Sequence, residues 1–265
     1  MRYVRLGCLG AAALLCSACF QFSTVLRVSG DGSGTIDQRM LFTQAAVGQL
    51  RQFAAMTGGG QPFEPVSEQQ ARDAAKTMGP GVTYVSSAPI DTSDGVGRDA
   101  HYSFTDISQL RLDQGPPSPA GLGLGPSTGA KPSMSFALTH QPDGHALLTV
   151  RVPQLPLVPG GTQAGPFGNM PPADQVAMLR PMLAGARMSI AIEPEGALVR
   201  TSSPYVDGRR VTIVDVSLDA LLSDPTLVPR LQAAKDAADA KSILRSAPDV
   251  HVNLDPELTI EFTPR

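Results

Sequence analysis

Short stretches in which apolar and polar residues alternate recur along this chain of 265 residues, and glycine-rich turns separate many of them. The first two stretches, 20–28 and 36–42, flank the turn GDGSG at 30–34. Alternation with a period of two is the pattern of a strand with one buried face, and a Gly/Asp turn between two such strands indicates a hairpin. A chain that repeats this unit is largely restricted to sheets in which neighbouring strands run antiparallel.

Periodicity also predicts the remaining elements. Ser67 and Gln70 have the spacing of a capping box at the start of one helix. Because strands and helices come in clusters, without a βαβ alternation, we predict an α+β fold with a mainly antiparallel sheet and packed helices. The strands are expected at 82–88, 98–105, 134–138, 148–152, 187–193, 197–202, 209–216 and 258–262, and the helices at 43–56, 67–78, 172–184 and 226–245.

Two segments are rich in glycine and proline. These residues make up 10 of 21 positions in 113–133 and 10 of 20 positions in 153–172. Such a composition is typical of extended linkers. The chain is therefore divided into a signal segment 1–18, an N-terminal part 19–112, a linker 113–133, a hairpin 134–152, a linker 153–172 and a C-terminal part 173–265.

The N-terminus has the layout of a secretory signal. Two arginines precede an apolar run at 6–15, which is too short to span a bilayer. The small residues directly before Cys19 resemble the lipobox of bacterial lipoprotein signal peptides, with Cys16 where leucine is usual. The resemblance implies cleavage before Cys19 and acylation of its thiol.

The cysteine content agrees with a lipid anchor. The chain has three cysteines, Cys8, Cys16 and Cys19, and none in the remaining 246 residues. A secreted domain held by disulfides would carry cysteines in its folded part. We therefore predict a membrane tether at Cys19, with a plain cleaved signal and an uncleaved anchor as the alternatives. Phe20, in place of an aspartate, points to the outer membrane in a two-membrane bacterium, and otherwise to the outer face of the cell membrane.

Charge and motifs exclude several classes of function. Without the two arginines of the signal segment, 19 basic and 24 acidic residues remain, so the net charge is −5. This charge disfavours nucleic acid as a partner. The sequence contains no G-x-S-x-G, S-x-x-K, HExxH or CxxC motif. We expect neither a cofactor nor catalytic activity.

Two sets of residues suggest a metal site at first sight. The segment 29–40 resembles an EF-hand loop at its centre, but Ser29 and Met40 occupy the end positions where aspartate and glutamate are needed. His140 and His145 flank a turn and could approach each other, but no third ligand is close in sequence. The other two of the four histidines are His101 and His251, and none of the four lies beside an obvious nucleophile. We expect no metal at either place.

Two segments resemble the LppM-like envelope lipoproteins of bacteria. The segment 24–42 has the strand, the turn of D-G-x-x-G type and the second strand with which these proteins begin after the lipidated cysteine. The segment 203–212, SPYVDGRRVT, is similar to their turn and strand before the last helix, although the tryptophan that follows Val-Thr in the family is missing. The resemblance implies an α+β envelope module for which lipid binding is proposed, and it transfers no catalytic residue.

These observations together predict a lipid-anchored, non-catalytic envelope module that binds a lipid or an envelope protein. One alternative is an assembly factor that docks a protein partner through an edge strand or the Gly/Pro-rich segments. The other is a hydrolase of the periplasm or cell surface whose active site is assembled from residues far apart in sequence.

Overall fold

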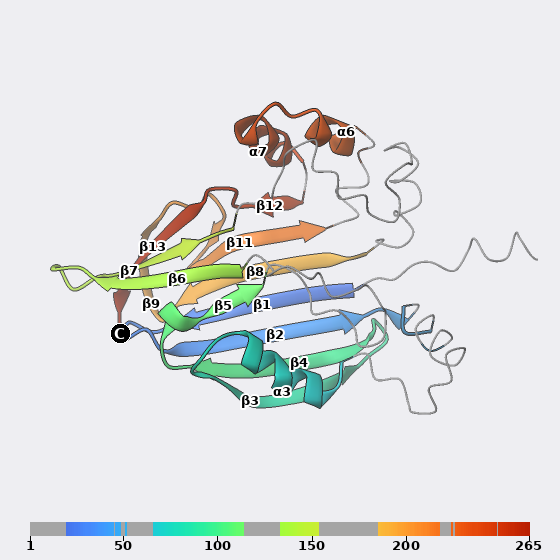
Figure 1. Ribbon diagram of the computed structural model, residues 1–265, viewed down its shortest axis with the longest axis horizontal. Coiled ribbons are helices and arrows are strands. Elements are labelled where there is room, and N and C mark those ends of the chain that lie inside the picture. The colour runs from blue at the N-terminus through green and yellow to red at the C-terminus, as the bar shows by residue number, and fades with distance from the viewer. Residues whose placement is uncertain are drawn as a thin grey trace, which may run out of the picture.

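The computed structural model describes residues 20–44, 46–48, 51, 66–113, 133–153, 185–217, 224, 226–247 and 249–265. Strands account for 53% and helices for 18% of these described residues. The predicted α+β fold with packed helices is therefore wrong: the protein is mainly β, with two sheets and few helices (Figure 1). The signal segment 1–18, Cys19, the helix predicted at 172–184 and the interiors of both Gly/Pro-rich segments lie outside the described residues.

The larger sheet has eight strands in the order β10-β11-β8-β1-β2-β4-β3, and β12 pairs with β11. The hairpin predicted around the turn 30–34 is confirmed as β1 and β2. β1 also pairs with β8 in parallel, a contact that no hairpin pattern predicts. The strands are β1 (Phe20–Val28), β2 (Gly34–Phe42), β3 (Val82–Asp91), β4 (Val96–Phe104), β8 (Arg187–Pro194), β10 (Val206–Asp207), β11 (Arg210–Ser217) and β12 (Val250–Val252).

The smaller sheet has five strands in the order β5-β6-β7-β13-β9, with antiparallel pairs throughout. The chain crosses from the larger sheet to the smaller one at Glu195, between β8 and β9. The hairpin predicted at 134–152 is confirmed as β6 and β7. The strands are β5 (Arg111–Asp113), β6 (Ser133–His140), β7 (Ala146–Arg151), β9 (Gly196–Thr201) and β13 (Glu257–Pro264).

One apolar core joins the two sheets. Alternate residues of each strand point inward, so that aliphatic and aromatic side chains of both sheets form a single buried cluster. The larger sheet contributes Leu26, Ile36 and Tyr102, and the smaller sheet contributes Leu148 and Phe262, all almost fully buried. Burial of this kind supplies the main driving force for folding.

The described helices are short and peripheral. In α3 (Glu68–Thr77) the predicted capping box between Ser67 and Gln70 is confirmed, and Ala71 and Ala75 are buried. The single long helix predicted at 226–245 is instead two helices, α6 (Leu227–Gln232) and α7 (Ala237–Arg245). The break arises because the Asp236 side chain accepts a hydrogen bond from the backbone of Asp239 and caps a new helix. A three-residue 3₁₀ helix, η2, spans Ile107–Gln109.

A second, smaller apolar cluster lies at the end of the larger sheet where β1 begins. It consists of Phe22, Met40, Phe42, Ala46 and Val47, with Phe20 packed against it. Among the helices in the described ranges, none is both long and apolar enough to cross a bilayer.

Candidate functional site

The first strand begins directly after the predicted lipidation site. β1 starts at Phe20, so the sheet follows Cys19 with no intervening spacer. Cys19 itself lies outside the described residues, and its acylation stays a prediction. If it is acylated, the anchored end of the protein is the end that carries the second apolar cluster.

The described structure gives each histidine a different set of partners. His140 Nε2 lies 2.7 Å from the carbonyl oxygen of Gly30, whereas His145 contacts carboxylates of the smaller sheet. His251 packs against the ring of Tyr205, with 4.8 Å between the ring centroids. The possible pairing of His140 and His145 across their hairpin is thus replaced by contacts to other elements.

His101 belongs to a row of charges on the outer face of the larger sheet. Its Nδ1 lies 2.7 Å from Asp37, which also pairs with Arg27 on β1. Arg27 and Arg210 both reach Glu193, at 3.5 and 3.4 Å. Burial opposes ionisation of Asp37, but hydrogen bonds from His101 and Arg27 outweigh it and lower the pKa of the carboxyl. The row connects five neighbouring strands, β4, β2, β1, β8 and β11, through charges of opposite sign.

A second polar cluster lies on the smaller sheet, around the buried carboxylate of Glu261. His145 Nδ1 is 3.0 Å from Glu261 and 3.2 Å from Asp143, and Arg200 Nε donates to Glu261 at 2.5 Å. The side chain of Glu261 is only 8% exposed. Sequence spacing misses this cluster because His145 and Glu261 are 116 residues apart and meet only through the pairing of β7 with β13.

The same cluster offers the third ligand that sequence reasoning did not find. Asp143, His145 and Glu261 each offer one ligand atom, and these three atoms lie within 4.8 Å of one another. Among the described residues, this is the group that could hold a metal ion. The guanidinium of Arg200 already occupies one oxygen of Glu261. Glu261 is thus held by hydrogen-bonding contacts to Arg200 and His145.

The Glu261 network predicts an acid-sensitive contribution to stability. Hydrogen bonds from Arg200, and then from His145, lower the pKa of Glu261 from its ordinary value of 4.5, although burial opposes them. A carboxyl whose pKa falls on folding stabilises the protein above the unfolded pKa, and this contribution is lost as the pH falls through the folded pKa. Glu261→Gln should therefore lower the thermal midpoint at neutral pH by a few degrees and flatten its decrease below pH 4.5.

Thermal unfolding between neutral and acidic pH tests this prediction. Glu257→Gln is the matched control, because Glu257 lies on the same strand and pairs with Arg151 at 3.8 Å but is 53% exposed. An exposed pair of this kind contributes little to stability. Equal shifts for the two variants would contradict the role assigned to Glu261.

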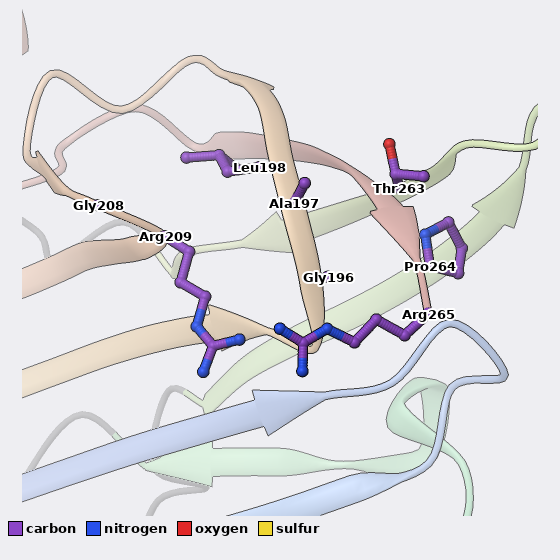
Figure 2. Close-up of a pocket in the computed structure, with 8 residues that line it drawn as sticks. All are labelled: Gly196, Ala197, Leu198, Gly208, Arg209, Thr263, Pro264 and Arg265. Carbon is purple, nitrogen blue, oxygen red and sulfur yellow. The ribbon is translucent and has the colours of Figure 1, made fainter.

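A pocket of about 520 Å³ opens where the smaller sheet meets the turn between β10 and β11. Its wall consists of the start of β9, the end of β13 and the turn residues Gly208 and Arg209 (Figure 2). The guanidinium groups of Arg209 and Arg265 extend along the same side of the opening, below Gly196 in the view of Figure 2. The lining residues are Gly196, Ala197, Leu198, Gly208, Arg209, Thr263, Pro264 and Arg265.

Two buried polar groups of the described residues, the Tyr102 hydroxyl and the Asn253 side-chain nitrogen, have no hydrogen-bond partner. Burial raises the pKa of the Tyr102 phenol to about 12. The ring of Tyr84 packs edge-on against it, with 6.1 Å between centroids. Since the phenol is enclosed by the apolar core, it is a packing residue.

Comparisons with known proteins give a weak structural likeness. No protein-family model matches the sequence, and no curated protein matches it. The structure is similar to the NMR structure of the folded domain of LppM from Mycobacterium tuberculosis, at 9% identity and a TM-score of 0.32, over 76% of this chain and 84% of that one. It is also similar to a crystal structure of a mutant M1 zinc metallopeptidase from Deinococcus radiodurans, at 10% identity and a TM-score of 0.21, over 77% of this chain and 40% of that one.

The first of these matches is a distant likeness only. At TM-scores below 0.5, neither match bears on what this chain binds or whether it catalyses a reaction. The signal segment, the acyl group on Cys19 and the envelope location remain predictions from the sequence.

Proposed function

We propose that this protein is a lipid-anchored, non-catalytic module of a bacterial envelope. The observation that carries the proposal is the cysteine of the lipobox-like segment, Cys19, which stands one residue before the first strand of the folded part. Two or three acyl chains on this residue would anchor the protein stably, because a single chain gives only marginal binding. The sheet would then begin at the membrane surface.

The chemistry of the anchored end supports contact with lipid. The second apolar cluster, which includes Phe22, Met40 and Phe42, is at this end, and Phe20 is only partly buried against it. Phe22, Met40 and Phe42 are buried, whereas Phe20 and Met188 at the edge of the cluster are only partly buried. Aromatic and methionine side chains suit an apolar ligand. Binding of an envelope lipid at this end is the finer part of the proposal.

Metabolic labelling in a bacterial host tests the anchor. Cells that express the full chain are fed an alkyne-bearing fatty acid, and label on the purified protein is measured after coupling to a fluorophore. We expect strong labelling of the unchanged chain and loss of label in Cys19→Ser, which lacks the thiol to be acylated. The protein should also move from the detergent-extracted membrane fraction to the aqueous fraction.

Cys8→Ser is the matched control, because it makes the same chemical change inside the apolar run of the signal segment. This variant should keep its label. Equal labelling of Cys19→Ser and the unchanged chain would overturn the proposal, since acyl transfer would then occur elsewhere or nonspecifically.

A further inference from the structure

No partner for either arginine of the pocket is found among the described residues, unlike for arginines of the neighbouring strands. Arg27, Arg200 and Arg210 each pair with a carboxylate. Within the described ranges, Arg209 and Arg265 form neither an ion pair nor a hydrogen bond, although they line the same opening. Two guanidinium groups at one opening therefore leave their positive charge available to a ligand.

Two acidic residues, Glu195 and Asp207, directly precede pocket residues in the sequence, but neither lines the pocket. The carboxylate of Glu195 accepts a hydrogen bond from the Ser29 hydroxyl at 2.6 Å. Among the described residues that line the pocket, only Arg209 and Arg265 have ionisable side chains.

The wall of the pocket is built from small and apolar residues. A Cβ on Gly196 would lie 2.0 Å from the carbonyl oxygen of Thr263, so β9 begins in tight contact with the end of β13. Gly208 has a φ of +59°, which allows the turn that holds Arg209 at the opening. Leu198 and Pro264 add apolar surface beside the two charges.

We propose that this pocket binds a ligand that carries a phosphate or a carboxylate next to a short apolar group. Planar guanidinium groups bind such anions through paired, charge-assisted hydrogen bonds, and two of them suit a group with several acceptor oxygens. A volume of about 520 Å³ is within the range of pockets for small ligands. The apolar wall accommodates the uncharged part of the ligand.

The pocket lies at the end of the larger sheet opposite the start of β1. β1 runs from Phe20 to Val28, and at its far end the backbone carbonyl of Val28 accepts a hydrogen bond from Glu195 N, next to the pocket. Nine residues of strand span about 30 Å. The C-terminal end of the described chain is at this far end, away from the start of β1 (Figure 1). A free anion thus reaches the pocket more readily than a headgroup of the anchoring membrane.

Calorimetric titration of the full chain tests the proposal. The titrated chain carries Cys19→Ser, so that acylation does not contribute. Hexyl phosphate is the probe, and hexyltrimethylammonium is the cationic counterpart of similar size. We expect saturable binding of hexyl phosphate alone. The double variant Arg209→Gln/Arg265→Gln should weaken it at least about tenfold, because both charged donors are removed.

Arg230→Gln/Arg245→Gln is the matched control, since it removes the same charge from α6 and α7, outside the pocket lining. It should leave the affinity unchanged. No binding by the chain with both pocket arginines, or equal weakening by the two double variants, would overturn the proposal. The outcome is independent of whether Cys19 is acylated.

Vesicles distinguish the source of the anion. Flotation with phosphatidylcholine vesicles, with and without phosphatidic acid, is run on the same variants. Binding of hexyl phosphate without flotation assigns the pocket to a free anion. Flotation that requires both phosphatidic acid and the two pocket arginines assigns the pocket to a lipid headgroup. If the double variant Arg209→Gln/Arg265→Gln still floats with the vesicles, no headgroup binds in this pocket.

Discussion

Replacing Phe262 with alanine is expected to lower the free energy of unfolding by about 3–5 kcal/mol. Phe262 is fully buried on β13 and stands between Ala146 of β7 and Leu198 of β9. Its ring belongs to the core that the smaller sheet shares with the larger one. Truncation removes the packed ring and leaves a cavity that strands hydrogen-bonded on both sides cannot readily fill.

Urea unfolding followed by circular dichroism measures this loss, and Val199→Ala is the control. Val199 lies on β9, next to Leu198, but is 47% exposed, so its truncation should change stability by no more than about 0.5 kcal/mol. Both sheets should unfold in one transition, because they share one core. A Phe262→Ala variant as stable as Val199→Ala would contradict the packing described for the smaller sheet.

The strands were predictable where the signal is local. In β1 and β2 the alternation of side chains and the Gly/Asp turn act within about 20 residues, and the observed register pairs Phe20 with Phe42 and Val28 with Gly34. The capping box at Ser67 is local in the same sense. Local patterns specify which face of a strand is buried but not which strand lies beside it.

The wrong fold class has a related cause. The alanine-rich composition of 226–245 predicts one long helix, whereas the Asp236 side chain accepts a hydrogen bond from Asp239 N and starts a second helix. Helical patterns at 43–56 and 172–184 also raised the expected helix content, and most of those residues lie outside the described part of the chain. Strands therefore dominate the described structure. The predicted fold class did not include their division into two sheets.

The candidate sites depend on contacts that are distant in sequence. The contact of His145 with Glu261 and the meeting of Arg209 with Arg265 both require β13 to lie in the smaller sheet, beside β7 and β9. No motif marks either contact, because each residue is common on protein surfaces. Cys19 is different, since the lipobox-like pattern is read along the chain and needs no fold.

Replacing Gly97 with alanine is expected to destabilise the protein on the order of 3 kcal/mol, because the larger sheet has no room for a methyl group at this position. Gly97 lies on β4, opposite Leu41 of β2. A Cβ at this position would lie 1.9 Å from the carbonyl oxygen of Met40 and 2.9 Å from the Cα of Leu41. Both obstacles are backbone atoms, so no side-chain rotation relieves the contact and the two strands must separate locally.

Gly48→Ala is the matched control for this change. Gly48 is helical, and a Cβ there would meet no atom within 4 Å. Alanine in a helix is favoured over glycine by up to about 1 kcal/mol, so this variant should be as stable as the unchanged chain or slightly more stable. Thermal and urea unfolding of the two variants give the comparison. A loss of stability confined to Gly97→Ala supports close pairing of β2 and β4 at this position. Equal stabilities of Gly97→Ala and Gly48→Ala would show that the two strands can separate further than the described pairing allows.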